Sequence, residues 1–208
     1  MSWPLAKETP EPDTHLPPEL ADEGESVKIT GFWMFLVTDV LIFASLFSVY
    51  AVYKSRVDVG PGPAQLFTLG PVLLETLLLL TSSFTVGMAI WSMRTNRIRA
   101  LTVWLVATLV LGAGFVTSEI HDFVTFVSQG YTWHVSGFLS AFYVLVGTHG
   151  SHVTAGILWA TALLIQLGRR GLTPSLRRKI YSFSLYWHFL DIVWVFIFTF
   201  VYLGGKIG

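Results

Sequence analysis

Cysteine is absent from this sequence of 208 residues, and charged residues are scarce. Without cysteine the chain cannot form disulfides, thiolate metal sites or thioether links to haem. Only 12% of the residues are charged, and 13 basic and 13 acidic side chains give a formal net charge of zero. A nucleic-acid-binding protein needs a basic surface, so we expect no nucleic acid among the partners.

Apolar residues, by contrast, are abundant: 53% of the chain is hydrophobic and 15% is aromatic. This composition is far too apolar for a soluble domain. Five stretches reach the roughly 20 apolar residues that a helix needs to cross a bilayer. We predict these spans at 29–53, 70–93, 100–127, 136–167 and 180–204. The expected fold class is therefore an all-α membrane protein with five transmembrane helices.

Residues 1–28 precede the first predicted span and are rich in acidic residues and prolines. They lack the basic start and the apolar middle of a signal peptide. A segment of this composition cannot bury enough apolar surface to fold on its own. We therefore predict a disordered, solvated tail over residues 1–28 and a transmembrane domain over residues 29–205.

Basic residues divide unequally between the two sides of the predicted membrane domain. With five spans, the amino-terminal tail, the second loop and the fourth loop share one side, which holds ten Lys and Arg residues. The opposite side holds three, namely Lys54, Arg56 and Lys206. Because cytoplasmic loops carry the excess of Lys and Arg, we predict a cytoplasmic amino terminus and a carboxyl terminus outside the plasma membrane.

Nine acidic and histidine side chains lie within or at the edge of the predicted spans, and two of them, His121 and Asp122, are close enough to the end of the third span to be simply solvated. The other seven are Asp39, Glu75, Glu119, His149, His152, His188 and Asp191. An Asp at the centre of a membrane helix costs about 2.5–3.5 kcal/mol to insert, so each group should face protein or water rather than lipid. Depth along the helices, at about 1.5 Å per residue, puts Glu75 and Glu119 toward the outer leaflet and the other five near mid-membrane.

Three pairs of these groups, one of which is Glu119 with Asp122, are spaced three residues apart, which puts both members of a pair on one helix face. His149 with His152, and His188 with Asp191, could together assemble a metal or haem site from two helices. The alternative is a set of hydrogen bonds between helices, worth roughly 0.6–2 kcal/mol each. We favour the second interpretation, because such intramembrane contacts are common.

The other candidates also allow a functional and a structural interpretation. Asp39 is either a proton-linked or lipid-associated carboxylate or a neutral packing residue, and the residues alone do not decide. Glu75 and Glu119 would share a proton if they touch, because adjacent carboxylates in a low dielectric cannot both ionise cheaply. Arg169 and Arg170 could bind anionic lipid headgroups or act only as topology signals.

Four of the spans contain motifs that, in this order, are highly specific for one known family. The motifs are GFWMFLVTD in the first span, LLETLLLLTSS in the second, GTHGSHV in the fourth and WHFLDIVW in the fifth. From Thr30 to Leu203 the sequence resembles subunit III of the haem-copper terminal oxidases. It looks most similar to the third subunit of the bo-type quinol oxidases.

The resemblance implies a subunit that is not an enzyme by itself and binds no haem or copper. It would pack against subunit I, which holds the haem and copper, and would associate with subunit II and a small subunit IV. Its helices would form a V, with spans one and two against spans three to five, and would hold phospholipid in the cleft. Such a subunit supports assembly, proton uptake and turnover stability of an H⁺-translocating quinol oxidase in the bacterial plasma (inner) membrane.

The resemblance also assigns roles to single residues. Asp39 matches the family's intramembrane carboxylate and His152 matches a cleft histidine, so both are candidates for a lipid-cleft or proton-linked role. Related oxidases carry an arginine near the end of the fourth span that contacts a lipid phosphate, whereas this chain has Ile165 there. Arg169 and Arg170, one turn later, could reach a headgroup instead.

Three alternatives remain open from the sequence. The electron donor is decided in other subunits, so the chain could belong to a cytochrome c oxidase. It could be an autonomous membrane haem or metal protein that uses His149, His152, His188 and Asp191. It could also be a small proton-coupled transporter with Asp39 and Asp191 as relay groups, although the sequence has no paired broken helices or convincing internal repeat.

Overall fold

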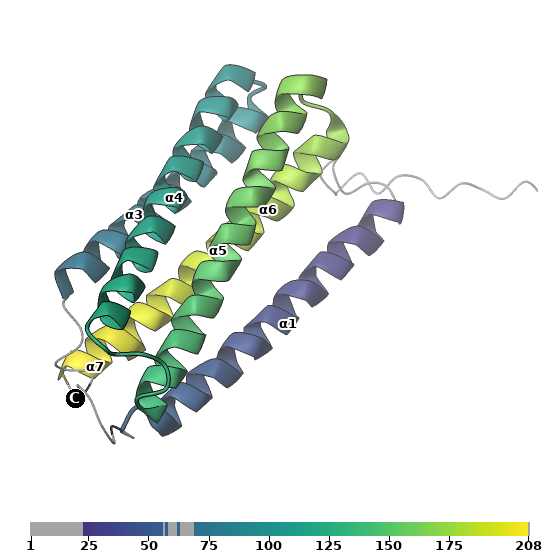
Figure 1. Ribbon diagram of the computed structural model, residues 1–208. Coiled ribbons are helices and arrows are strands. Elements are labelled where there is room, and N and C mark those ends of the chain that lie inside the picture. Colours follow the sequence, from purple (N-terminus) through teal and green to yellow (C-terminus); the bar gives the residue numbers. More distant parts are fainter. Residues whose placement is uncertain (1–22, 56, 58–61, 63–68, 208) are drawn as a thin grey trace, which may run out of the picture.

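The computed structural model describes residues 23–55, 57, 62 and 69–207, and every element in this part of the chain is helical (Figure 1). The elements are α1 (Glu23–Tyr53), α3 (Leu69–Arg94), α4 (Ile98–Ser128), α5 (Gly137–Arg170), α6 (Pro174–Ile197), the π-helix η1 (Phe198–Leu203) and α7 (Gly204–Ile207). Five helical segments are long and apolar enough to cross a membrane, namely Thr30–Tyr53, Leu69–Arg94, Ile98–Ser128, Gly137–Arg170 and Pro174–Lys206. The predicted all-α fold with five candidate membrane spans is confirmed.

The first and last long helices begin earlier than the apolar pattern predicts. Helix α1 begins at Glu23 rather than at residue 29, so residues 23–28 of the expected tail are helical, and residues 1–22 lie outside the described part. Helix α6 begins at Pro174 rather than at residue 180 because Thr173 caps it: the Thr173 hydroxyl accepts a hydrogen bond from the Leu176 amide at 3.3 Å. Pro174 at the first helical position suits this start. Polar residues therefore extend these helices beyond the apolar stretch.

Helices α3, α4, α5 and α6 form a four-helix bundle, and α1 lies along one side of it (Figure 1). Within the bundle α3 packs on α4 and α6, and α5 packs on α4 and α6. Helix α1 makes its main contacts with α5 and then α6, through a stripe of buried residues that includes Leu36, Asp39, Phe43 and Tyr50. Since α1 and α3 are not main packing partners, a V that has spans one and two as a single arm is not confirmed.

The centre of the bundle is built around the indole of Trp187 on α6. A Cβ added at Gly112 of α4 would lie 2.9 Å from this ring, and one at Gly156 of α5 would lie 2.8 Å from it. The indole Nε1 donates a hydrogen bond to the Ser82 hydroxyl of α3 at 2.9 Å. One side chain thus joins all four helices of the bundle.

The close approaches differ from those that the small residues of the fourth span suggest. The spacing of Gly147, Ser151 and Ala155 is typical of helices that pack closely. In the structure Ser151 and Ala155 are exposed, and the tight contacts of α5 are at Gly150 and Gly156. The small residues therefore predicted close packing of the correct helix but on the wrong face. The residues in close contact, Gly150 and Gly156, are the chain neighbours of Ser151 and Ala155.

At the basic end of the bundle, side chains tie the α3–α4 turn to α6. Arg177 donates to the Met93 carbonyl at 3.1 Å and also to the Asn96 side-chain oxygen. The Arg94 guanidinium donates to the Tyr181 hydroxyl at 2.7 Å. Asn96 has a φ of 56°, a left-handed conformation that Asn tolerates better than most residues.

Candidate functional site

Asp39 of α1 and His152 of α5 face one another between the two helices. Asp39 Oδ1 lies 3.8 Å from His152 Nε2, within ion-pair range but beyond a normal hydrogen bond. The other ring nitrogen, Nδ1, lies 2.7 Å from the Thr148 carbonyl oxygen, and the Tyr186 hydroxyl donates to the His152 carbonyl at 2.9 Å. Both expected residues of this pair are therefore brought together.

The Thr148 carbonyl determines which tautomer of His152 faces Asp39. A carbonyl oxygen can only accept, so Nδ1 must be the protonated nitrogen in this hydrogen bond. In the neutral ring, Nε2 then has a lone pair directed toward the carboxyl group. The neutral imidazole and the Asp39 carboxyl group thus face one another at 3.8 Å.

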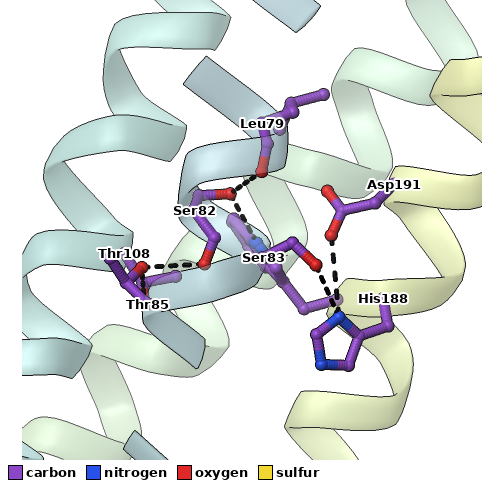
Figure 2. Close-up of polar contacts among 8 residues, drawn as sticks. Leu79, Ser82, Ser83, Thr85, Thr108, His188 and Asp191 are labelled. Atoms are coloured by element: carbon purple, nitrogen blue, oxygen red, sulfur yellow. Dashed lines mark hydrogen bonds and ion pairs between the residues drawn. The ribbon is translucent and has the colours of Figure 1, made fainter. Parts of the chain in front are cut away.

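His188 and Asp191 form a separate pair on the α3 side of α6. Figure 2 shows the His188 ring directed toward Ser83 of α3, with Nδ1 2.7 Å from the Ser83 hydroxyl and 3.8 Å from Asp191 Oδ2. The next residue of α6, Phe189, instead faces Phe43 of α1. Consecutive helical residues point about 100° apart. For this reason the five groups expected near mid-membrane do not form one cluster.

Hydroxyl groups that were not among the predicted site residues accompany this pair. Thr85 of α3 and Thr108 of α4 are joined by a hydrogen bond of 2.8 Å, and the Ser82 hydroxyl donates to the Leu79 carbonyl at 2.7 Å (Figure 2). The signal was present as the polar run TSSFT at 81–85 within an apolar span. The Thr85–Thr108 bond joins α3 to α4, whereas the Ser82–Leu79 bond lies within α3.

His149 is fully buried, with 0% of its surface exposed, and lies among aromatic rings. Its ring centroid is 5.3 Å from that of Trp194, 5.8 Å from that of Phe115 and 6.3 Å from that of Phe43. Neither ring nitrogen has a hydrogen-bond partner among the described residues. In this part of the chain no group of three or more His, Asp or Glu side chains is arranged to hold a metal ion, so the predicted candidates do not form a ligand set for one.

Glu75 of α3 and Glu119 of α4, which were predicted at the same depth, interact electrostatically. They expose 1% and 5% of their surface, and one oxygen of each lacks a hydrogen-bond partner among the described residues. This acid pair comes from α3 and α4, whereas Asp39 and His152 face one another between α1 and α5.

An apolar groove of about 570 Å³ lies between α1 and α6, beginning next to the Asp39–His152 pair. Phe43 lines the groove, and its ring centroid is 5.3 Å from that of His152. Other lining residues are Phe47, Tyr50, Phe189, Phe196 and Phe200, and Lys54 lies at the far end. A groove of this chemistry fits an acyl chain with a headgroup near a cation.

Arg169 and Arg170 belong to the last turn of α5 and are exposed at the basic end. From His152 to Arg169 the helix rises by about 25 Å at 1.5 Å per residue. The two arginines are thus remote from the groove and from Asp39. They could contact a lipid headgroup only at the membrane surface opposite to the one where Lys54 lies.

The fold and these polar pairs define a multi-pass α-helical membrane protein whose ionisable groups face other helices. The family model for cytochrome c oxidase subunit III matches residues 24–206. The chain belongs to this family.

Relatives match nearly the full length of the chain. Quinol oxidase subunit 3 of Bacillus subtilis (strain 168) is 48% identical over 196 residues, covering 94% of this chain and 96% of the relative. Cytochrome c oxidase subunit 3 of Bacillus sp. (strain PS3) is 47% identical and covers 89% of each chain. Cytochrome bo(3) ubiquinol oxidase subunit 3 of Pseudomonas putida is 44% identical and covers 88% of each.

Proposed function

We propose that this chain is the non-catalytic third subunit of a proton-pumping terminal quinol oxidase. The single observation that supports this most is the 48% identity to a quinol oxidase subunit 3 over 94% of the chain. The partners would be subunit I, with the haem and copper, subunit II, a small subunit IV and membrane phospholipids. The complex would lie in a bacterial plasma (inner) membrane, with the amino terminus cytoplasmic and the carboxyl terminus outside.

The choice of electron donor follows from two of the three relatives described above. The Bacillus subtilis and Pseudomonas putida proteins are named as quinol oxidase subunits, and the protein of strain PS3 as a cytochrome c oxidase subunit. A cytochrome c oxidase is therefore the second candidate. Neither donor reaction needs a redox group in this chain.

Within this function, Asp39 and His152 would act on proton uptake and turnover stability. Their geometry allows one proton to move between a buried carboxyl group and an imidazole, and the adjacent groove would hold a phospholipid acyl chain. A lipid there would fill the space between α1 and α6 and keep α1 on the bundle. Arg169 and Arg170 would contact anionic headgroups at the cytoplasmic surface.

The alternatives from a different class have less support. An autonomous haem or metal protein would need convergent ligands, whereas His149 lies among aromatic rings and His188 bonds Ser83 on another face. A transporter relay from Asp39 to Asp191 would have to pass between separate pairs.

Co-purification from the native membrane tests the proposed function. The tagged chain should bring down a larger haem-bearing subunit and quinol:oxygen activity, and the chain purified alone should have no haem absorbance. A preparation that oxidises reduced cytochrome c but not quinol would favour the second candidate. Haem bound to the isolated chain, or substrate uptake by vesicles that contain only this chain, would contradict the proposal.

A further inference from the structure

Glu75 and Glu119 form a buried acid pair that the proposed function does not use. They come from adjacent helices, α3 and α4, and both are more than nine-tenths buried. Glu75 Oε1 and Glu119 Oε1 have no hydrogen-bond partner among the described residues. Two buried carboxylates that interact with each other cannot both remain ionised without a compensating cation.

The electrostatic partners of this acid pair include a serine hydroxyl, a phenol and a third carboxyl group, and none of these three is a cation. From α4, Ser118 and Asp122 interact with Glu75, and Asp122 also interacts with Glu119. From η1, the buried phenol of Tyr202 interacts with both glutamates and with Asp122. From α5, Gly150 faces Glu119, and its neighbour His149 lies against Phe115 and Trp194. The available neutralising ligand is a proton.

Gly150 makes the space in which the Glu119 carboxyl group lies. A Cβ at position 150 would overlap Glu119 Oε2 and would lie 2.8 Å from its carboxyl carbon. On the other side, η1 packs against α3 and brings Tyr202 to the glutamates. The acid pair is thus enclosed by α3, α4, α5 and η1, and its position is determined by their packing.

One side of the acid pair leads toward solution. Asp122, one turn further along α4 from Glu119, is partly buried, and it interacts with His121, which is exposed. Both residues precede the end of α4 at Ser128 and the connection to α5. A carboxyl group and an imidazole at increasing exposure are the usual components of a proton path.

We propose that Glu75 and Glu119 are a proton-binding site that exchanges with solution through Asp122 and His121 at the α4–α5 end of the bundle. The site holds at least one proton at neutral pH. The side of the membrane with which the site exchanges protons rests on the proposed function, which puts the α4–α5 connection outside the cytoplasm. The existence of the site does not depend on that orientation.

Labelling with dicyclohexylcarbodiimide tests the site, because this apolar reagent reacts with protonated carboxyl groups. The carboxyl proton moves to one carbodiimide nitrogen, the carboxyl oxygen bonds to the central carbon, and an O-to-N acyl shift gives a stable N-acylurea. The experiment uses the complex as purified from membranes, reconstituted in sealed vesicles, with mass spectrometry of this chain. The pH is changed on one side of the membrane at a time.

We expect Glu75 or Glu119 to be modified at neutral pH. Alkaline solution on the α4–α5 side should remove the modification, since each pH unit beyond the titration lowers the protonated fraction about tenfold. The variant Gln129→Cys identifies this side, because the chain has no other cysteine and an impermeant maleimide labels it only when added on the side where the α4–α5 connection lies. Glu119→Gln should lower the modification of Glu75 at neutral pH several-fold, because the carboxylate that shares its proton is gone. Asp191→Asn, which removes a buried acid elsewhere, should leave it unchanged.

Three outcomes would overturn the proposal: no modification of either glutamate at any pH, modification that follows the pH of the opposite side, or modification of Glu75 that ignores Glu119→Gln. If the chain does not co-purify with an oxidase, the same labelling is run on the chain in its own membranes. Failure of the proposed function is thereby distinguished from failure of this site.

Discussion

The indole of Trp187 lies directly on the backbone of Gly156, so closely that a Cβ at position 156 would be 2.8 Å from ring atom Cζ3. Real Cβ atoms do not approach another atom so closely, and a Cβ at Gly112 would also lie within 2.9 Å of the Trp187 ring. The ring therefore has no room to move when the glycine side gains an atom. Helices α4, α5 and α6 depend on this contact for their spacing.

Gly156→Ala should therefore destabilise the bundle by about 1–3 kcal/mol, the usual cost of overpacking a filled core. Thermal or detergent-induced unfolding of the purified complex, followed by Trp fluorescence, measures the change. Gly168→Ala is the matched control on the same helix, because a Cβ there meets nothing within 4 Å. Equal stability of the two variants would contradict the packing described for Trp187.

A double-mutant cycle should detect the hydrogen bond from Trp187 Nε1 to the Ser82 hydroxyl. Trp187→Phe and Ser82→Ala each remove one partner, and we expect a coupling free energy of about 0.5–2 kcal/mol between them. Trp194→Phe combined with Ser82→Ala serves as the control, because Trp194 donates instead to Thr76. A coupling near zero for the first pair would show that the contact contributes nothing to stability.

Arg177→Ala should loosen the α3–α4 turn, because Arg177 donates to the Met93 carbonyl and to Asn96. The loss of hydrogen bonds from a charged donor should cost about 1.5–3 kcal/mol and speed proteolysis at the turn. Arg99→Ala removes an exposed charge from the same end of the bundle and is the control. The comparison is made from the rates of cleavage by a protease added on that side of the membrane. An unchanged rate for Arg177→Ala would show that the hydrogen bonds from Arg177 do not hold the turn.

Asp39→Asn keeps the size of the side chain but removes its ability to hold a proton. If Asp39 and His152 act as proposed, the variant should assemble normally, keep its initial oxidase rate within about twofold and lose activity sooner during turnover. His152→Ala should lower the phospholipid retained by the purified complex, since His152 borders the groove through Phe43. Thr38→Val, at the neighbouring exposed position, is the control.

The outcome for Asp39 and His152 decides between the two interpretations that the sequence left open. Full activity, lipid content and turnover lifetime in both variants would mean that these residues only pack α1 against α5. A shortened lifetime with normal assembly supports the proton-linked role. The measurements are oxygen consumption over successive turnovers and phosphate analysis of the purified complex.

The five spans were predictable because length and apolar content determine membrane helices almost without reference to neighbours. Their ends were not, because Thr173 and Pro174 start α6 outside the apolar stretch. Depth along the chain also puts Glu75 and Glu119 at the same level of the membrane, and the structure shows an electrostatic interaction between them that depth alone left open. The depth of a residue in the membrane can be predicted because each helical residue adds a fixed rise along the axis.

Which helix each polar group faces could not be predicted in the same way. His149 and His152 share a general face at three residues apart, yet His149 is enclosed by aromatic rings while His152 meets Asp39. The helix that a side chain faces depends on the rotation of its own helix and on which helices are neighbours, and neither can be read from hydropathy. The arrangement of α1 beside α5 rather than α3 is the main example.

That arrangement has a consequence for biogenesis. During synthesis α1 enters the bilayer first, but its packing partners, α5 and α6, are the last long helices to emerge. The α3–α4 hairpin can close as soon as both of its helices are inserted, whereas α1 can dock only after α5, with His152, has been made. Among the described helices α1 is therefore made before the partners on which it docks, and it must stay near the nascent chain for correct folding.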